Sequence, residues 1–116
     1  MRILGSLCVL LFFLVSCTKS TNAVSGLYIE NSPVSGRSQL NFISNTLLMK
    51  SETGSNYRDT FIYSISPNKI SLTPTWTSTP YASILDFQTI DANSFRIENL
   101  YPSIPEAPKT YMIFKK

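Results

Sequence analysis

Apolar and polar residues alternate in short segments along the chain from about residue 26 onward. The clearest alternation lies at residues 60–65, where Phe61, Tyr63 and Ile65 take every second position. A period of two places successive side chains on opposite faces of a β-strand, so that one face meets a core and the other meets water. The pattern predicts strands at about residues 27–30, 38–43, 46–51, 58–65, 69–73, 82–90, 94–100 and 110–115.

Short polar segments separate these predicted strands. Three of them have the composition of tight hairpin turns, namely Ser44-Asn45, residues 66–68 and residues 91–93. Asn and Asp tolerate positive φ angles, and Pro67 presets the first position of its turn. Because tight turns pair neighbouring strands antiparallel, most of the chain is predicted to be a meander. No segment after residue 20 keeps apolar residues at helical spacing for three turns, which indicates an all-β domain.

A meander of about eight short strands leaves two sheet edges that must be hidden from other chains. Closing the meander into a barrel removes both edges. We therefore predict a small antiparallel up-and-down barrel over residues 26–116. An antiparallel β-sandwich with the same number of strands is the alternative.

The N-terminal residues differ in composition from the rest of the chain. Met1-Arg2 gives a short positive start, and residues 3–15 are almost entirely apolar. This run is too short for a comfortable transmembrane helix, which needs about 20 apolar residues, so a cleaved export signal at residues 1–16 fits better. Residues 17–25 are mostly small and polar after Cys17, which is the composition of a flexible tether.

The apolar run ends in Leu14-Val15-Ser16-Cys17. This segment resembles the lipobox of bacterial lipoprotein signal peptides, in which a Leu, a small or branched residue and a small residue precede a cysteine. The resemblance implies that residues 1–16 are removed, that the Cys17 thiol carries a diacylglyceryl group, and that a membrane is the partner. The alternative is an ordinary secretory peptide cut near Ser16, which leaves Cys17 as a free thiol. Because Thr18 rather than Asp follows the cysteine, the resemblance implies a lipid anchor in the outer membrane.

Composition excludes several kinds of site in the mature chain. Cys8 lies inside the predicted signal, so Cys17 would be the one cysteine left, which excludes disulfides and cysteine zinc sites. The sequence has no histidine, which removes the commonest general base. Removal of residues 1–16 takes away Arg2, one of 10 basic residues, and none of the 7 acidic ones, which leaves a net charge of +2. This charge is too weak to indicate nucleic acid as a partner.

No pattern in the sequence indicates an enzyme or a cofactor. There is no glycine-rich phosphate loop and no Gly-x-Ser-x-Gly nucleophile segment. Asp86 and Glu98 could approach each other, because their strands are predicted to pair across the turn at residues 91–93. Both alternate with apolar residues, so they are predicted to face water as ordinary surface charges. We therefore predict no catalytic residue and no metal site.

Two proline-rich segments are predicted to be stiff loops. Residues 72–81 hold the single tryptophan between two prolines, and residues 101–108 contain three further prolines. If strands alternate in direction, both loops lie at the same end of the barrel. They would then place four large side chains around one mouth, as the candidate ligand or partner site: Trp76, Tyr81, Tyr101 and Ile104. Aromatic side chains on rigid loops bind ligands or anchor partners, and the alternative is that Trp76 folds back to plug the barrel.

Gly26-Leu27-Tyr28 stands where the first strand is predicted to begin, and Tyr63-Ser64-Ile65 is followed after a turn by Lys69-Ile70-Ser71-Leu72. In these features, and in strand number and spacing, residues 26–116 resemble small bacterial lipoproteins with a lipocalin-like domain, whose first strand begins with Gly-x-Trp. Tyr28 takes the place of the tryptophan. The resemblance implies a barrel that binds a small apolar or amphipathic molecule. The alternative is an envelope protein without a cavity that binds another protein, as an assembly accessory, inhibitor or adhesin.

Overall fold

The structure, a computed structural model, describes residues 24–101, 104 and 107–116. Within these ranges all regular elements are β-strands. They are β1 (Gly26–Ser32), β2 (Ser38–Phe42), β3 (Leu47–Glu52), β4 (Arg58–Ser66), β5 (Lys69–Pro74), β6 (Ser83–Asp91), β7 (Ser94–Glu98) and β8 (Tyr111–Lys115). The predicted all-β class is confirmed, and each predicted strand is present with bounds that differ by at most about two residues.

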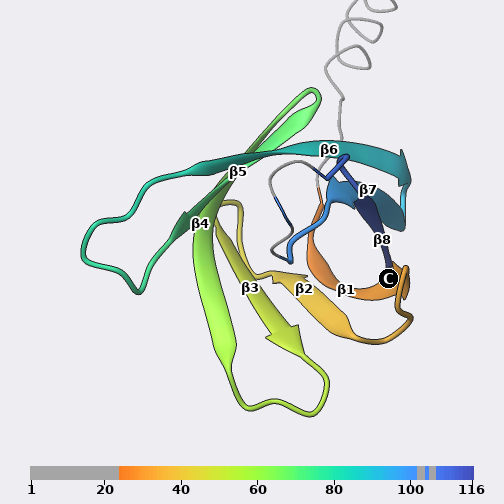
Figure 1. Cartoon of the computed structure of the whole chain (residues 1–116), viewed down its shortest axis with the longest axis horizontal. Helices are drawn as coiled ribbons and strands as arrows, with labels where there is room; N and C mark the ends of the chain where they lie inside the picture. The colour runs from red at the N-terminus through yellow and green to blue at the C-terminus, as the bar shows by residue number, and fades with distance from the viewer. Residues whose placement is uncertain (1–23, 102–103, 105–106) are drawn as a thin grey trace, which may run out of the picture.

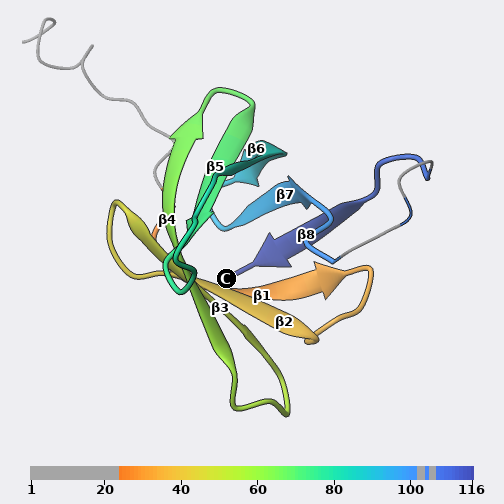
Figure 2. The same ribbon diagram turned by 60° about the vertical axis from the view of Figure 1, so that its left-hand side comes forward.

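The strands form a closed antiparallel barrel in which each strand pairs with its neighbours in the sequence (Figure 1). β1 also pairs with β8, with Glu30 opposite Phe114, and this pairing closes the sheet on itself. Figure 2 shows β1 and β8 side by side. The predicted up-and-down, lipocalin-like barrel is therefore confirmed, and the β-sandwich alternative is wrong. Closure satisfies the backbone groups of strands that would otherwise form open edges.

The connections give the barrel two unlike ends. At the turn end, short connections join β2 to β3, β4 to β5 and β6 to β7, and the chain enters through Val24. At the loop end, longer connections join β1 to β2, β3 to β4, β5 to β6 and β7 to β8. Figure 1 shows the β3–β4 and β5–β6 connections extending away from the barrel in different directions. The hairpin turns predicted at residues 44–45, 66–68 and 91–93 all lie at the turn end.

Alternate residues of the strands point inward and fill the middle of the barrel. Phe95 is fully buried, and its ring centroid lies 4.9 Å from that of Tyr28, 5.1 Å from that of Phe87 and 5.4 Å from that of Phe114. The Phe42 ring completes this group at 5.8 Å from Phe95. Aliphatic side chains pack around the rings, and these are Leu40, Leu48, Ile70, Leu72, Ile97 and Met112. Because the middle is filled in this way, the pockets described below lie at the two ends.

Candidate functional site

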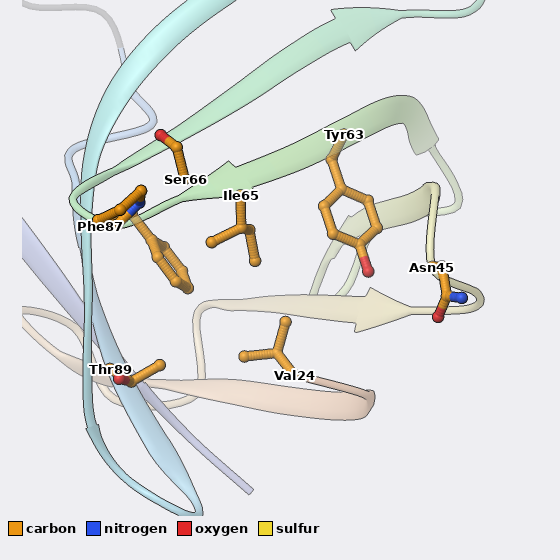
Figure 3. Close-up of a pocket in the computed structure, with 8 residues that line it drawn as sticks. Val24, Asn45, Tyr63, Ile65, Ser66, Phe87 and Thr89 are labelled. Atoms are coloured by element: carbon orange, nitrogen blue, oxygen red, sulfur yellow. The ribbon is translucent and has the colours of Figure 1, made fainter. Parts of the chain in front are cut away.

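A pocket of about 590 Å³, the turn-end pocket, opens at the turn end of the barrel. Its walls come from β4, β6, two turns and the residue through which the chain enters. The lining residues are Val24, Asn45, Tyr63, Ile65, Ser66, Pro67, Phe87 and Thr89. Figure 3 shows the side chains of Val24, Ile65 and Phe87 directed into the same space. The pocket is therefore formed largely by apolar groups from strands that are distant in sequence.

The turn-end pocket combines an apolar base with a few polar groups. Tyr63 and Phe87 belong to the buried core, and Ile65 packs against it half-buried. Amide and hydroxyl groups come from Asn45, Ser66 and Thr89. None of the lining residues carries a charge. A charged group placed here would leave water without gaining an ionic partner, so the pocket suits the apolar part of a neutral or amphipathic molecule.

Tyr63 fixes one wall of the turn-end pocket. Its hydroxyl group donates a hydrogen bond of 2.8 Å to the backbone carbonyl of Ser44 in the β2–β3 turn. Its ring meets the Phe42 ring edge to face, with centroids 5.1 Å apart. Burial raises the pKa of Tyr63, so the hydroxyl stays protonated and this wall stays neutral. Tyr63 thereby holds the β2–β3 turn against β4.

Sequence reasoning did not identify the turn-end pocket. The alternation at residues 60–65 correctly places Tyr63 and Ile65 on the inner face, but it does not show whether that face is filled. The space depends on Thr89, a small residue on the inner face of β6, opposite Phe95 on β7. It also depends on the position of Val24, the residue through which the chain enters the barrel. One signal was present in the sequence: the inward position next to the β6–β7 turn carries a threonine rather than a large side chain.

A second pocket, of about 270 Å³, lies at the loop end. Its lining combines apolar side chains with two charged ones, and consists of Lys50, Asp59, Phe61, Leu72, Trp76, Ser83, Leu85, Asn99 and Leu100. The Trp76 ring packs edge to face on Phe61, with centroids 5.2 Å apart. Trp76 is nevertheless 57% exposed. It therefore rests on the rim of this pocket with more than half of its surface in water.

The four predicted rim residues have different surroundings. Tyr101 is half-buried, and the Lys50 ammonium group lies 5.0 Å from the centre of its ring. Lys50 also lines the loop-end pocket together with Trp76, so Trp76 and Tyr101 share a neighbour at this end. Tyr81 is 80% exposed and Ile104 is 70% exposed, and neither lines the loop-end pocket. The structure thus brings Trp76, Lys50 and Tyr101 together, and leaves Tyr81 and Ile104 in water.

A buried carboxylate at the loop end was not identified from the sequence. The Glu30 side chain is fully buried and accepts hydrogen bonds from the Arg37 guanidinium at 2.8 and 3.0 Å. It also accepts bonds from the Ser38 hydroxyl at 2.8 Å and from the Val34 backbone N–H at 3.1 Å. Burial by itself raises the pKa of Glu30, but these hydrogen bonds and the positive charge outweigh burial and hold the pKa below its ordinary value. Glu30 is thus ionised and ties the β1–β2 loop to the barrel.

Tyr101 packs next to this group. The Arg37 guanidinium lies 4.2 Å from the centre of the Tyr101 ring. The Tyr101 hydroxyl oxygen is buried near Glu52 and Ser38, and it has no hydrogen-bond partner of normal geometry among the residues that the structure describes. Burial raises the pKa of Tyr101, and the Glu52 carboxylate raises it further, so the hydroxyl stays protonated. The Tyr101 ring is thus held by stacking and burial, and the Tyr101 backbone N–H donates a hydrogen bond of 2.9 Å to the Asn99 side chain.

Asp86 and Glu98 lie together on the outer surface of β6 and β7. The backbone N–H of Asp86 donates a hydrogen bond of 3.0 Å to the Glu98 carboxylate. The Asp86 carboxylate pairs with Lys69 at 2.6 Å and with Lys109 at 3.2 Å, and it accepts a bond of 2.9 Å from the Tyr111 hydroxyl. These partners, Lys69 first, lower the pKa of Asp86 far below its ordinary value. A carboxylate held ionised in this way belongs to a surface ion network and is poorly suited to donate a proton.

Several predictions concern residues outside the described ranges. These residues are the predicted signal peptide at 1–16, Cys17 with the first part of its predicted tether at 18–23, and residues 102–103 and 105–106 of the second proline-rich loop. Within residues 24–101, 104 and 107–116, no helix is long and apolar enough to cross a membrane. In the same part of the chain, no cluster of acidic residues, histidine or cysteine could hold a metal ion.

Comparison with known proteins gives no match, whether to a protein-family model, a curated protein or a solved structure. The function must therefore be inferred from the barrel itself and from the residues that precede it.

Proposed function

We propose that this protein is a lipid-anchored lipoprotein of the bacterial envelope whose lipocalin-like barrel binds a small apolar or amphipathic molecule. The observation that carries the proposal is the turn-end pocket, with about 590 Å³ of space and no charged lining residue. Pockets of a few hundred cubic ångströms are typical of small-molecule sites. The rings packed around Phe95 block the way deeper into the barrel, so the ligand binds at its end.

The lining of the pocket indicates the kind of ligand. An apolar group can rest on Val24, Ile65 and Phe87, where burial contributes about 25 cal/mol for each Å² removed from water. An uncharged polar end can bond to Asn45 or Ser66. The proposal includes no catalytic step, no cofactor and no nucleic-acid partner.

The lipid anchor on Cys17 is the second part of the proposal. Its support is the resemblance of residues 14–17 to a lipobox. Two acyl chains hold a protein at a membrane far more firmly than one, which suits a protein that stays in the envelope. We assign it to the outer membrane because Thr18 follows the cysteine. Labelling cells with a radioactive fatty acid tests the anchor: the wild-type chain should become labelled, whereas Cys17→Ser should stay unlabelled and leave the membrane fraction.

A substitution that fills the turn-end pocket tests the ligand site. The neutral fluorescent probe N-phenyl-1-naphthylamine should bind the wild-type protein. Val24→Trp should weaken this binding about tenfold or more, equivalent to about 1.4 kcal/mol, because the indole takes the space of the probe. Val34→Trp is the matched control, since it makes the same exchange at an exposed valine of the loop end. If the wild-type protein binds no probe, or if both variants bind it equally well, the turn-end pocket is not the site.

Native mass spectrometry identifies the natural ligand. Protein purified from its own host should retain a small apolar or amphipathic molecule, and the Val24→Trp variant should retain less of it. An empty wild-type protein would argue for the second candidate function.

A protein partner is that second candidate, and the loop end favours it. Each loop-end connection carries at least one large apolar residue exposed to water, and these are Val34, Tyr57, Trp76, Tyr81 and Ile104. Exposed aromatic residues often anchor protein interfaces. Replacing Trp76 and Tyr81 with Ala should then abolish cross-linking to one envelope protein and leave N-phenyl-1-naphthylamine binding unchanged. The opposite result would favour the small ligand.

A further inference from the structure

The outer surface of the barrel has a charged side and an uncharged side. On β5–β8, Asp86 and Glu98 form an ion network with Lys69 and Lys109. On β1–β4, the outward positions hold apolar side chains or uncharged amides and hydroxyls, with Arg58 near the loop end as the exception within these strands. The acidic and basic residues of β1 and β3 point inward instead, as Glu30 and Lys50 show. The β1–β4 side is therefore unusually free of charge for a surface in contact with water.

Five apolar residues on this side form a continuous patch, the apolar outer face, and these are Leu27, Ile43, Leu47, Met49 and Ile62. The backbone N–H of Ile43 bonds to the Leu47 carbonyl at 2.9 Å, and Leu47 is paired with Ile62, so these three residues lie in one row across the sheet. Leu27 and Met49 lie in the next row, on either side of Asn41. Scattered exposed apolar residues need no explanation, but a contiguous patch indicates an interaction surface.

The chain enters the barrel beside the apolar outer face. Gly26, the first residue of β1, is paired with Phe42, so the entry point is next to Leu27 and Ile43. Residues 18–23 separate Cys17 from Val24, and this stretch spans at most about 25 Å when fully extended. A lipid anchor on Cys17 therefore keeps Val24, the entry point beside the apolar outer face, within about 25 Å of a bilayer.

Basic residues flank β1 on the side away from the patch. Lys115 on β8 is paired with Ile29 on β1, and Lys116 follows it. Both lysines are exposed to solvent, and the Lys116 ammonium group lies 5.4 Å from the centre of the Tyr28 ring. Lysines next to a membrane attract anionic lipids. The surroundings of the entry point are thus apolar on one side and basic on the other.

We propose that the apolar outer face lies on the surface of the bilayer that carries the anchor, with Lys115 among the headgroups of anionic lipids. This inference rests on the proposed acylation of Cys17. In this orientation the ion network of β5–β8 faces water. The turn-end pocket then opens close to the lipid surface, from which an apolar ligand enters it without crossing bulk water.

Fluorophores at matched positions test this orientation. Once residues 1–16 are removed and Cys17 is acylated, a single introduced cysteine is the one free thiol, so it takes the label selectively. Ile62→Cys places an environment-sensitive fluorophore on the apolar outer face, and Ile84→Cys places it on β6. The two isoleucines are 55% and 60% exposed, which makes the second a close control. Both full chains are expressed in a host that acylates them, purified, and reconstituted into vesicles of phosphatidylethanolamine and phosphatidylglycerol with spin-labelled lipids.

The label at Ile62→Cys should emit at shorter wavelength and be quenched by the spin-labelled lipids several-fold more strongly than the label at Ile84→Cys. Equal quenching at the two positions, or stronger quenching at Ile84→Cys, overturns the inference. A blue shift at Ile62→Cys without lipid quenching also overturns it, and shows that a second copy or another protein covers the face. Flotation separates these outcomes from failure of the anchor: a wild-type chain that does not float with the vesicles disproves the acylation and the orientation together.

Methionine oxidation tests the proposed orientation without a fluorescent label. Met49 lies on the apolar outer face, whereas Met112 is fully buried in the barrel. Vesicle binding of the acylated chain should slow oxidation of Met49 by hydroxyl radicals several-fold, relative to the Cys17→Ser variant free in solution, and should leave Met112 unchanged. Equal oxidation of Met49 in both states contradicts the proposed orientation.

Discussion

The two ends of the barrel differ because their connections differ in length. At the turn end, β4 and β5 are joined by residues 67–68 alone, and a small inward residue, Thr89, leaves an uncharged pocket. At the loop end, β5 and β6 are joined by residues 75–82, and other long connections bring side chains back over the barrel. Tyr101 and Arg37 are two such side chains. The larger of the two pockets thus lies where the connections are too short to supply side chains that cover the barrel.

Phe95→Ala should have the largest effect, because Phe95 packs between the two ends and contacts four other rings. Removing a buried phenylalanine ring typically lowers the free energy of unfolding by about 3–5 kcal/mol. Urea titration followed by tyrosine and tryptophan fluorescence measures the loss. Ile84→Ala on the exposed outer surface is the control and should change stability by less than about 0.5 kcal/mol. A loss under about 1 kcal/mol for Phe95→Ala would mean that the rings do not form a packed barrier.

Glu30→Ala should have the next largest effect and should act at the loop end. The substitution removes the partner of Arg37 and Ser38 from a buried site, so we expect a loss of about 3 kcal/mol in the free energy of unfolding. Glu52→Ala is the comparison, since its ion pair with Lys50 is 3.7 Å long and lies partly in water. That variant should lose less than about 1 kcal/mol. Binding of N-phenyl-1-naphthylamine by folded Glu30→Ala should be unchanged if the two ends act independently.

The same carboxylate makes the stability of the loop end depend on pH. Because the pKa of Glu30 is lower in the folded chain than in the unfolded chain, its ionisation stabilises the fold above the ordinary pKa of about 4.3. This stabilisation is lost as the pH falls through the lower pKa of the folded state. The stability difference between the wild type and Glu30→Gln should therefore be greatest near neutral pH and shrink below about pH 4. A difference that stays constant between pH 7 and pH 3 would show that Glu30 is not ionised.

The smallest expected effects come from removing two tyrosine hydroxyls, one at each end of the barrel. Tyr63→Phe removes a hydroxyl that donates a 2.8 Å bond to Ser44 at the turn end, and should cost about 1 kcal/mol of unfolding free energy. Tyr101→Phe removes a buried hydroxyl with no partner among the described residues of the loop end, and should cost nothing or stabilise slightly. Thermal unfolding of the two variants side by side measures the contrast. An equal loss at both positions would show that the Tyr101 hydroxyl is hydrogen-bonded in solution.

The sequence predicts the architecture well because strand alternation and turn formation depend on residues that are close together in the chain. The inward positions of Phe61, Tyr63 and Ile65 and the turn at residues 66–68 all follow from near neighbours. The buried Glu30 could not be found in this way. Its inward direction follows from Tyr28 two positions earlier, but its partner Arg37 is supplied by the loop, whose conformation the alternation does not determine.

The candidate site was harder to predict than the fold. A pocket is present only where the side chains do not fill the space between the strands, and alternation along the chain does not show how well that space is filled. The proline-rich loops correctly indicate that Trp76 and Tyr101 lie at one end. They do not reveal that Tyr81 stays in water, because a stiff loop can extend away from the barrel as easily as over it. The turn-end pocket depends on packing between β4, β6 and Val24, which are distant in the sequence.

The pairing of β1 with β8 also sets an order of events during folding. The hairpins between neighbouring strands can form as soon as their residues are available, but β1 has no second partner until the eighth strand arrives. Contacts between residues so far apart in the chain form slowly, so closure is expected to be the last step. Until then β1 and β7 are open edges that can pair with other chains. If the N-terminus is held at a membrane, the risk that these open edges pair with other chains is greatest after anchoring and before β8 pairs with β1.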